Sequence, residues 1–111
     1  MQDLWTTRTE GVAIDRGLVG FKVVGGGEKI GRVDHVNFSG TCVGIVTGGF
    51  RKSRHVVPAA AIDQVDLDTR TVELSLTAEQ VAGGPEYDEH SGVDEECESR
   101  ISEYYGSILK P

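Results

Sequence analysis

The sequence of 111 residues carries 18 acidic and 11 basic side chains, so its formal net charge is −7. This length is typical of a single domain with one core. No apolar stretch approaches 18 residues, and the first residues lack a basic start followed by an apolar block. The sequence therefore predicts no membrane insertion and no secretory signal, and we expect a cytoplasmic protein.

The negative charge is concentrated near the C-terminus. Residues 86–111 contain eight acidic and two basic residues, whereas the first 85 residues contain ten and nine. A body that is close to neutral disfavours a general nucleic-acid binder or a binder of anionic membranes. The two cysteines, Cys42 and Cys97, are too few for a disulfide framework and are expected to be reduced thiols.

The first periodic segment begins at Leu18, after an N-terminal extension (1–17) without a clear period in which 12–14 is the one candidate strand. Apolar and polar residues alternate over 18–24, which predicts a half-buried strand. The three glycines 25–27 then allow a tight reversal, because glycine tolerates positive φ.

Residues 30–38 are predicted to form the return strand. Ile30, Val36 and Phe38 would share one face, whereas Val33 would fall on the other. A register change near Asp34-His35 would correct this, and such a bulge is common where a sheet curls.

Further short strands follow. The apolar run 42–46 predicts a strand covered on both sides, with Cys42 in the core, and 55–57 predicts another that Pro58 ends. One helical turn fits residues 59–63. Alternating residues on either side of 68–70 then predict a hairpin in which Val65 and Leu67 share the apolar face with Val72, Leu74 and Leu76.

Two helices are expected in the C-terminal part. Thr77 to Gln80 fits a capping box, and the glycines 83–84 would end the short helix. Ser91 to Asp94 fits a second capping box. Val93, Cys97, Ile101 and the tyrosine pair 104–105 recur at helical spacing, with Gly106 as the expected C-terminal cap.

The order of these segments resembles the PRC-barrel family. The resemblance rests on the strand 18–24, Glu28 to Val33, His55 to Pro58 and the segment 62–74, and it extends to Pro85-Glu86-Tyr87-Asp88 and Glu103 to Gly106. It implies a mainly-β fold, a small and strongly bent antiparallel β-barrel with a short helix and a C-terminal amphipathic helix. Residues 18–85 would form the barrel, and 86–111 an acidic loop and helix.

Family members with known roles act in assembly rather than catalysis. The resemblance implies docking on photosynthetic membrane complexes for one class, and maturation of the small ribosomal subunit through a ribosomal protein for another. This sequence has neither the membrane anchor of the reaction-centre H subunit nor the N-terminal RNA-associated domain of the second class. It is therefore expected to be a stand-alone bacterial member.

No motif indicates chemistry. The glycines 25–27 lack the Lys-Ser/Thr of a phosphate loop and the third glycine of a dinucleotide loop. The acids 63, 66 and 68 fail the calcium-loop pattern, because Arg70 and Thr71 stand where a ligand and glycine are needed. The histidines and cysteines have no metal-ligand spacing. We therefore expect no enzyme and no catalytic, cofactor-binding or metal site.

Two groups are candidate partner contacts. Arg51, Lys52 and Arg54 form a basic loop that could meet RNA phosphate or an acidic protein, although a solvated loop is the simpler interpretation. Tyr104 and Tyr105 could lie in an interface, or they could close the end of the barrel.

The leading hypothesis is a non-enzymatic protein-interaction or assembly module that associates with itself, for example as a homodimer. Its basis is the expected exposed strand edges and the amphipathic acidic helix. One alternative is an RNA- or ribosome-associated accessory protein, although the charge disfavours nucleic acid. A second alternative is a small-ligand or stress-related sensor domain. The sequence does not identify the protein partner.

Overall fold

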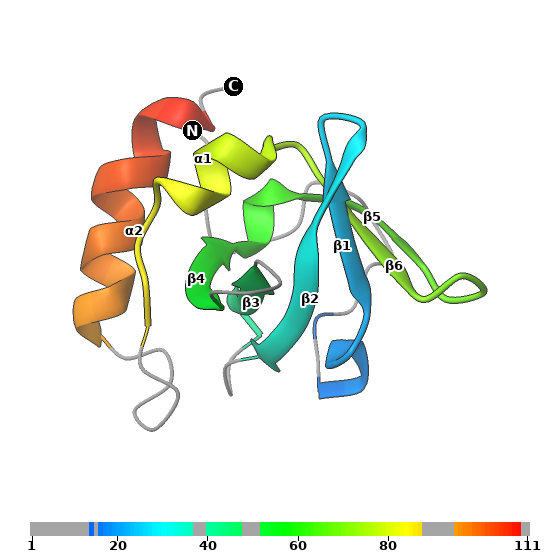
Figure 1. The fold of residues 1–111 in the computed structure, drawn as a ribbon. Coiled ribbons are helices and arrows are strands. Elements are labelled where there is room, and N and C mark those ends of the chain that lie inside the picture. Colours follow the sequence, from blue (N-terminus) through cyan, green and yellow to red (C-terminus); the bar gives the residue numbers. More distant parts are fainter. Residues whose placement is uncertain (1–13, 15, 37–39, 48–51, 88–94, 110–111) are drawn as a thin grey trace.

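A computed structural model describes residues 14, 16–36, 40–47, 52–87 and 95–109. Within these residues, six strands form one sheet, and two helices pack beside it (Figure 1). The elements are β1 (Lys22–Gly25), β2 (Glu28–Val36), β3 (Cys42–Thr47), β4 (Ser53–Pro58), β5 (Ile62–Asp66), β6 (Thr71–Leu74), α1 (Ala78–Ala82) and α2 (Glu95–Ile108), with 3-10 helices η1 (Arg16–Leu18) and η2 (Ala59–Ala61). The mainly-β class with a short and a C-terminal helix is confirmed.

The sheet is mixed rather than purely antiparallel, which corrects the expected topology. Its strand order is β4-β3-β2-β1-β6-β5. β1 and β6 pair in parallel, with Lys22 opposite Thr71, whereas the other neighbouring strands are antiparallel. Parallel neighbours cannot be joined by a tight turn. The chain accordingly passes through four other strands before β6 returns beside β1.

The sheet is strongly bent but not closed. β4 and β5 lie at opposite ends of the strand order, and yet only the three residues of η2 connect them. Three residues span at most about 10 Å, so the two edges must approach each other. No ladder joins β4 to β5 in the described part of the chain. The predicted bend is therefore present, whereas the expected barrel remains open.

Irregularities in strand pairing help the sheet to bend. The register shifts between Val23 and Val24, between Val33 and His35, and between Ile62 and Gln64. The second of these confirms the register change predicted near Asp34-His35. A bulge bends the strand and increases its twist, which a strongly curved sheet requires.

Tight turns connect β1 to β2 and β5 to β6. Gly26 and Gly27 have φ angles of 60° and 82°, which confirms the predicted glycine reversal between β1 and β2. Between β5 and β6, Asp66 Oδ1 accepts hydrogen bonds from the backbone N–H groups of Asp68 (2.9 Å) and Thr69 (3.2 Å). Arg70 then adopts a φ of 54° before β6 begins.

Two apolar residues do not lie where their alternation suggested. β1 begins at Lys22 rather than Leu18, because Leu18 belongs to η1 and its carbonyl accepts a hydrogen bond from the Phe21 N–H (3.0 Å). Val19 is consequently 44% exposed. Leu67 is 74% exposed, because it lies in the turn after β5 instead of on the inner face of the sheet.

The core lies on the inner face of the bent sheet and beneath both helices. Its side chains are buried and come from every strand, and they include Val23, Ile30, Val33, Cys42, Ile45, Val56, Val57, Ile62, Val72, Leu76 and Val81. The burial of Cys42 is as predicted. η2 over Ala59–Ala61 confirms the first part of the helical turn expected at 59–63, whereas residues 62–63 already belong to β5. In α1, Thr77 and Gln80 form the predicted capping box, and Gly83 is the C-cap.

α2 packs its Ile101 and Tyr105 side chains into the core. It continues past Gly106 to Ile108, so Gly106 is not the expected cap; the Leu109 N–H still donates to the Tyr105 carbonyl (2.9 Å).

The candidate strand 12–14, the second capping box at 91–94 and the Cys97 side chain lie outside what the structure describes. None of the described helices has the length and apolar character needed to cross a membrane.

Tyr105 provides a test of how α2 is held. Its hydroxyl is fully buried and has no hydrogen-bond partner among the described residues, and burial raises its pKa well above the usual value of 10.0. Since the unfolded chain then ionises first, stability should fall as the pH rises above about 10. Tyr105→Phe removes the unsatisfied group, so we expect about 1 kcal/mol more stability at neutral pH and a smaller alkaline loss.

Urea denaturation of both proteins at pH 7 and pH 10.5 measures these differences. Tyr104→Phe is the matched control, because the Tyr104 hydroxyl donates to the Gln80 carbonyl (2.7 Å) and its removal should destabilise. A loss of stability in Tyr105→Phe at pH 7 would mean that the hydroxyl is satisfied.

Candidate functional site

The basic loop predicted as a contact does not form an open cluster in the described residues. Arg51 lies outside them, and Lys52 is exposed just before β4. Arg54 is already engaged, because its Nε donates to Asp34 Oδ2 across 3.2 Å. An outside contact through these residues stays a prediction, and only Lys52 is shown without a competing ion pair.

The two predicted tyrosines hold α2 against the end of α1. Their rings meet edge to face, with centroids 4.8 Å apart. Tyr105 is inside the core, whereas Tyr104 is half-buried. A Cβ on Gly83 would lie 2.9 Å from Tyr104 Oη, and one on Gly84 would lie 2.7 Å from Tyr105 Oη, so both glycines permit this close packing. This arrangement fits the alternative of closing one end of the sheet, and their role in an interface remains a prediction.

Tyr87 anchors the segment that follows α1. Its hydroxyl donates to Asp34 Oδ2 across 2.8 Å, so Asp34 serves both Tyr87 and Arg54. The ring lies directly over Gly44 of β3, where a Cβ would be 2.5 Å from the ring carbon Cζ. The bulge at Asp34 therefore has a specific use, because it directs a carboxylate toward a side chain from a distant part of the sequence.

The same segment covers one edge of the sheet. The Val56 N–H donates to the Pro85 carbonyl (3.0 Å), and the Tyr87 N–H donates to the Arg54 carbonyl (3.2 Å). His55 Nδ1 lies 3.3 Å from the Gly84 carbonyl oxygen, a contact that requires the proton on Nδ1. The outer edge of β4 is therefore not the exposed edge that the self-association hypothesis assumed.

A basic cleft lies where the middle strands β1 and β2 adjoin the β5–β6 turn. Lys22 of β1, Arg32 of β2 and Arg70 of the β5–β6 turn line an open hollow of about 440 Å³, together with Gly20 and Thr69. Lys22 and Arg32 are direct cross-strand partners. Within the described part of the chain, no carboxylate forms an ion pair with any of the three cations.

Backbone and ring contacts fix the two arginines of this basic cleft. One Arg32 guanidinium nitrogen donates to the Gly20 carbonyl across 3.2 Å. The Arg70 guanidinium carbon lies 5.4 Å from the centre of the Phe21 ring, and the Arg70 carbonyl accepts the Lys22 N–H (3.0 Å). The hydrogen bonds from Thr69 and Asp68 lower the pKa of Asp66, so the carboxylate that shapes the Arg70 turn is charged at neutral pH.

The clustering of three cations is electrostatically unfavourable in the free protein. Like charges directly opposite each other on neighbouring strands destabilise a sheet. The chain nevertheless places Lys22 opposite Arg32 and adds Arg70 beside them, although its net charge is −7. An anion bound in the basic cleft would offset this repulsion, which makes the cleft the strongest candidate site in the described residues.

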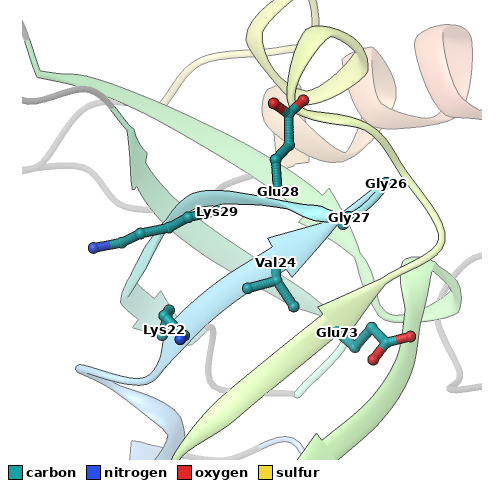
Figure 2. A pocket seen from close by; sticks show the side chains of 8 residues that line it. Lys22, Val24, Gly26, Gly27, Glu28, Lys29 and Glu73 are labelled. Atoms are coloured by element: carbon teal, nitrogen blue, oxygen red, sulfur yellow. The ribbon is translucent and has the colours of Figure 1, made fainter.

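A second hollow of about 420 Å³ adjoins the basic cleft and shares Lys22 with it. It surrounds the Gly26-Gly27 turn and also contains Lys29, Glu28 and Glu73 (Figure 2). In that view the Glu28 carboxylate and the Lys29 ammonium group point in different directions. Because this hollow carries both charge signs, it lacks the single-sign character of the basic cleft.

The sequence contains only a weak signal for the basic cleft. With Gly26 and Gly27 as a two-residue turn, regular pairing would place Lys22 opposite Gly31. The register shift after Val23 places it opposite Arg32 instead. Arg70 is added by the pairing of β6 with β1, which local patterns do not specify.

Among the described residues, no three histidine, cysteine or acidic side chains cluster as metal ligands.

The Tyr87 anchor can be tested by removing one hydroxyl. Tyr87→Phe keeps the ring over Gly44 but removes the hydrogen bond to Asp34, so we expect a loss of about 1 kcal/mol in the free energy of unfolding. Gly44→Ala should cost more, because its Cβ would lie 2.4 Å from Tyr87 Oη and would displace the ring. Chemical denaturation measures both. Equal stability of Tyr87→Phe and the parent protein would show that the hydrogen bond contributes nothing.

Comparisons with known proteins do not establish a family. No family model matches the chain. A stretch of 60 residues is 37% identical to part of GTPase Era of Leifsonia xyli subsp. xyli. This match covers 54% of this chain but only 20% of that protein. The fold also matches the crystal structure of a putative 16S ribosomal RNA processing protein, RimM, from Pseudomonas aeruginosa, at a TM-score of 0.47 and 19% identity over 65% of this chain and 48% of the other. The chain is thus similar to parts of two longer proteins, and PRC-barrel membership stays an interpretation.

Proposed function

We propose that this chain is a non-enzymatic docking module that attaches to an RNA-containing assembly through the basic cleft. The observation that carries the proposal is the convergence of Lys22, Arg32 and Arg70 with no carboxylate paired to them in the described residues. Cations of this kind bind RNA mainly through its phosphates. The ribosome is the first assembly to test, because the resemblance to PRC-barrel proteins implies a ribosomal role for one class.

The lining of the basic cleft favours a polyanion over a protein partner. Interface cores between proteins are rich in apolar and aromatic side chains. The described residues that line this cleft are instead cationic, hydroxylic or glycine. This lining supports the cleft, rather than the loop 51–54, as the proposed RNA contact.

The net charge of −7 does not oppose this proposal, because the charges are segregated. Residues 86–111 carry a net charge of −6 and the first 85 residues a net charge of −1, and α2 lies on the side of the molecule away from the β5–β6 turn (Figure 1). The molecule extends 32 by 31 by 26 Å, whereas the Debye length is about 8 Å at physiological ionic strength. The repulsion from α2 is therefore largely screened at the basic cleft.

Co-sedimentation with ribosomal subunits from the host tests the proposal. We expect Arg32→Glu to abolish co-sedimentation, because it reverses a charge inside the basic cleft. The matched control is Lys52→Glu, which makes the same change of charge at an exposed residue outside the cleft and should bind like the parent protein. If the three cations neutralise up to three phosphate charges of the RNA, the slope of log K against log salt should be about −2 to −3.

Two results would contradict the proposal. Unchanged binding by Arg32→Glu, together with loss of binding by Lys52→Glu, would return the contact to the predicted loop. Absence of binding by the parent protein, together with a dimer in sedimentation velocity, would favour self-association instead.

A further inference from the structure

We infer that the basic cleft is a phosphate site that holds one phosphate monoester in its dianionic form. The inference rests on the proposed function, because it uses the same cleft, but it narrows the ligand from a polyanion to a single terminal group. Such a group is found at the 5′ end of a processed RNA, and free inorganic phosphate presents a similar dianionic set of oxygens.

The three cations line a single hollow. They come from three segments of chain, namely β1, β2 and the β5–β6 turn. The adjoining hollow that shares Lys22 contains Glu28 and Glu73. A nucleic-acid strand continuing in that direction would bring its next phosphates toward these carboxylates. A compact anion at the end of a strand avoids that repulsion.

The formal charges also favour a dianion. Lys22, Arg32 and Arg70 contribute three positive charges, with no paired carboxylate in the described part of the chain. A phosphate monoester carries a charge of about −1.5 to −2 near neutral pH, whereas an internal phosphodiester carries one negative charge. The monoester therefore neutralises more of the like-charge repulsion between the cross-strand partners Lys22 and Arg32.

The arginines are held in place before any ligand binds. Arg32 is oriented by the Gly20 carbonyl, and Arg70 lies over the Phe21 ring. A guanidinium presents several N–H donors in a fixed plane, which suits the oxygens of phosphate. Phe21 is itself buried, so it provides no open surface on which a base could stack. The basic cleft is thus built to contact phosphate rather than bases.

Arg70 occupies a backbone position that would suit another residue better. Its φ of 54° is the one positive value among the described residues other than glycine. Glycine and asparagine adopt this region most easily, whereas other residues do so at a conformational cost. An arginine at such a position is explained if its side chain is needed in the basic cleft.

This conflict between backbone and side chain gives a sharp test. Arg70→Asn suits the turn and removes the cation, so its melting temperature should equal or exceed that of the parent protein while its phosphate binding is lost. Arg70→Lys retains the charge and should retain weaker binding. Arg32→Gln removes a cation outside the turn, so it tests the site even if the Arg70 variants fail to fold.

Two probes distinguish free inorganic phosphate from the 5′ end of an RNA as the source of the bound group. Titration with inorganic phosphate should shift the backbone amide signals of residues 20–22, 32 and 69–71 in NMR spectra of the full chain. A short RNA oligonucleotide with a 5′-phosphate should bind about tenfold more tightly than the same strand with a 5′-hydroxyl, a difference of about 1.4 kcal/mol. Arg70→Asn and Arg32→Gln should abolish that difference.

Two outcomes would overturn the inference. Equal affinity for the two oligonucleotides, with sensitivity to Arg32→Gln retained, would mean that the basic cleft contacts internal phosphates; the proposed function would then survive without the phosphate-monoester site. Inorganic phosphate that leaves the amide signals of the cleft unchanged would also refute the site. Loss of co-sedimentation with ribosomal subunits is a separate readout and concerns the proposed function alone.

Discussion

The connection between the two edge strands dictates the form of the whole sheet. β4 and β5 stand at opposite ends of a six-stranded order, but only Ala59–Ala61 separate them in the chain. A flat sheet of six strands, spaced about 4.8 Å apart, would place its edges more than 20 Å from each other. Three residues cannot bridge that distance, so the sheet must curl until its edges nearly meet. All three alanines are buried at this junction, where larger side chains would keep the edges apart.

The tight curl brings backbone segments so close together that some positions accept only glycine. A Cβ on Gly25 would lie 2.1 Å from the Leu76 carbonyl oxygen, and a Cβ on Gly31 would lie 2.1 Å from that of Val46. Neither residue is required by a positive φ. Glycine is needed at both positions because the first hairpin packs so closely against its neighbours that a Cβ would not fit. The pairing of β1 with β6 also sets Lys22 opposite Thr71, beside the β5–β6 turn, and this allows residues from three segments to share one cleft.

The features that could be predicted from the sequence are those decided by local interactions. The Gly26-Gly27 reversal and the Thr77 capping box depend on residues a few positions apart, and both are present. The parallel pairing of β1 with β6 depends on strands that are distant in the sequence, so alternation could not reveal it. The basic cleft was missed for the same reason. Its formation requires the shift that sets Lys22 opposite Arg32, and it also requires the distant Arg70.

The short stretch from Pro85 to Tyr87 occupies the outer edge of β4 as the strand of another molecule would. An uncovered edge is a template for pairing with a second chain, which is the route to fibrils and other aggregates. The protein thus keeps its own edge shielded with a segment that lies outside the sheet order. Because Tyr87 reaches its binding place over Gly44 from the end of that segment, the same contacts could be made by the Tyr87 of another copy. Exchange of this segment would create a domain-swapped pair without any new interface chemistry.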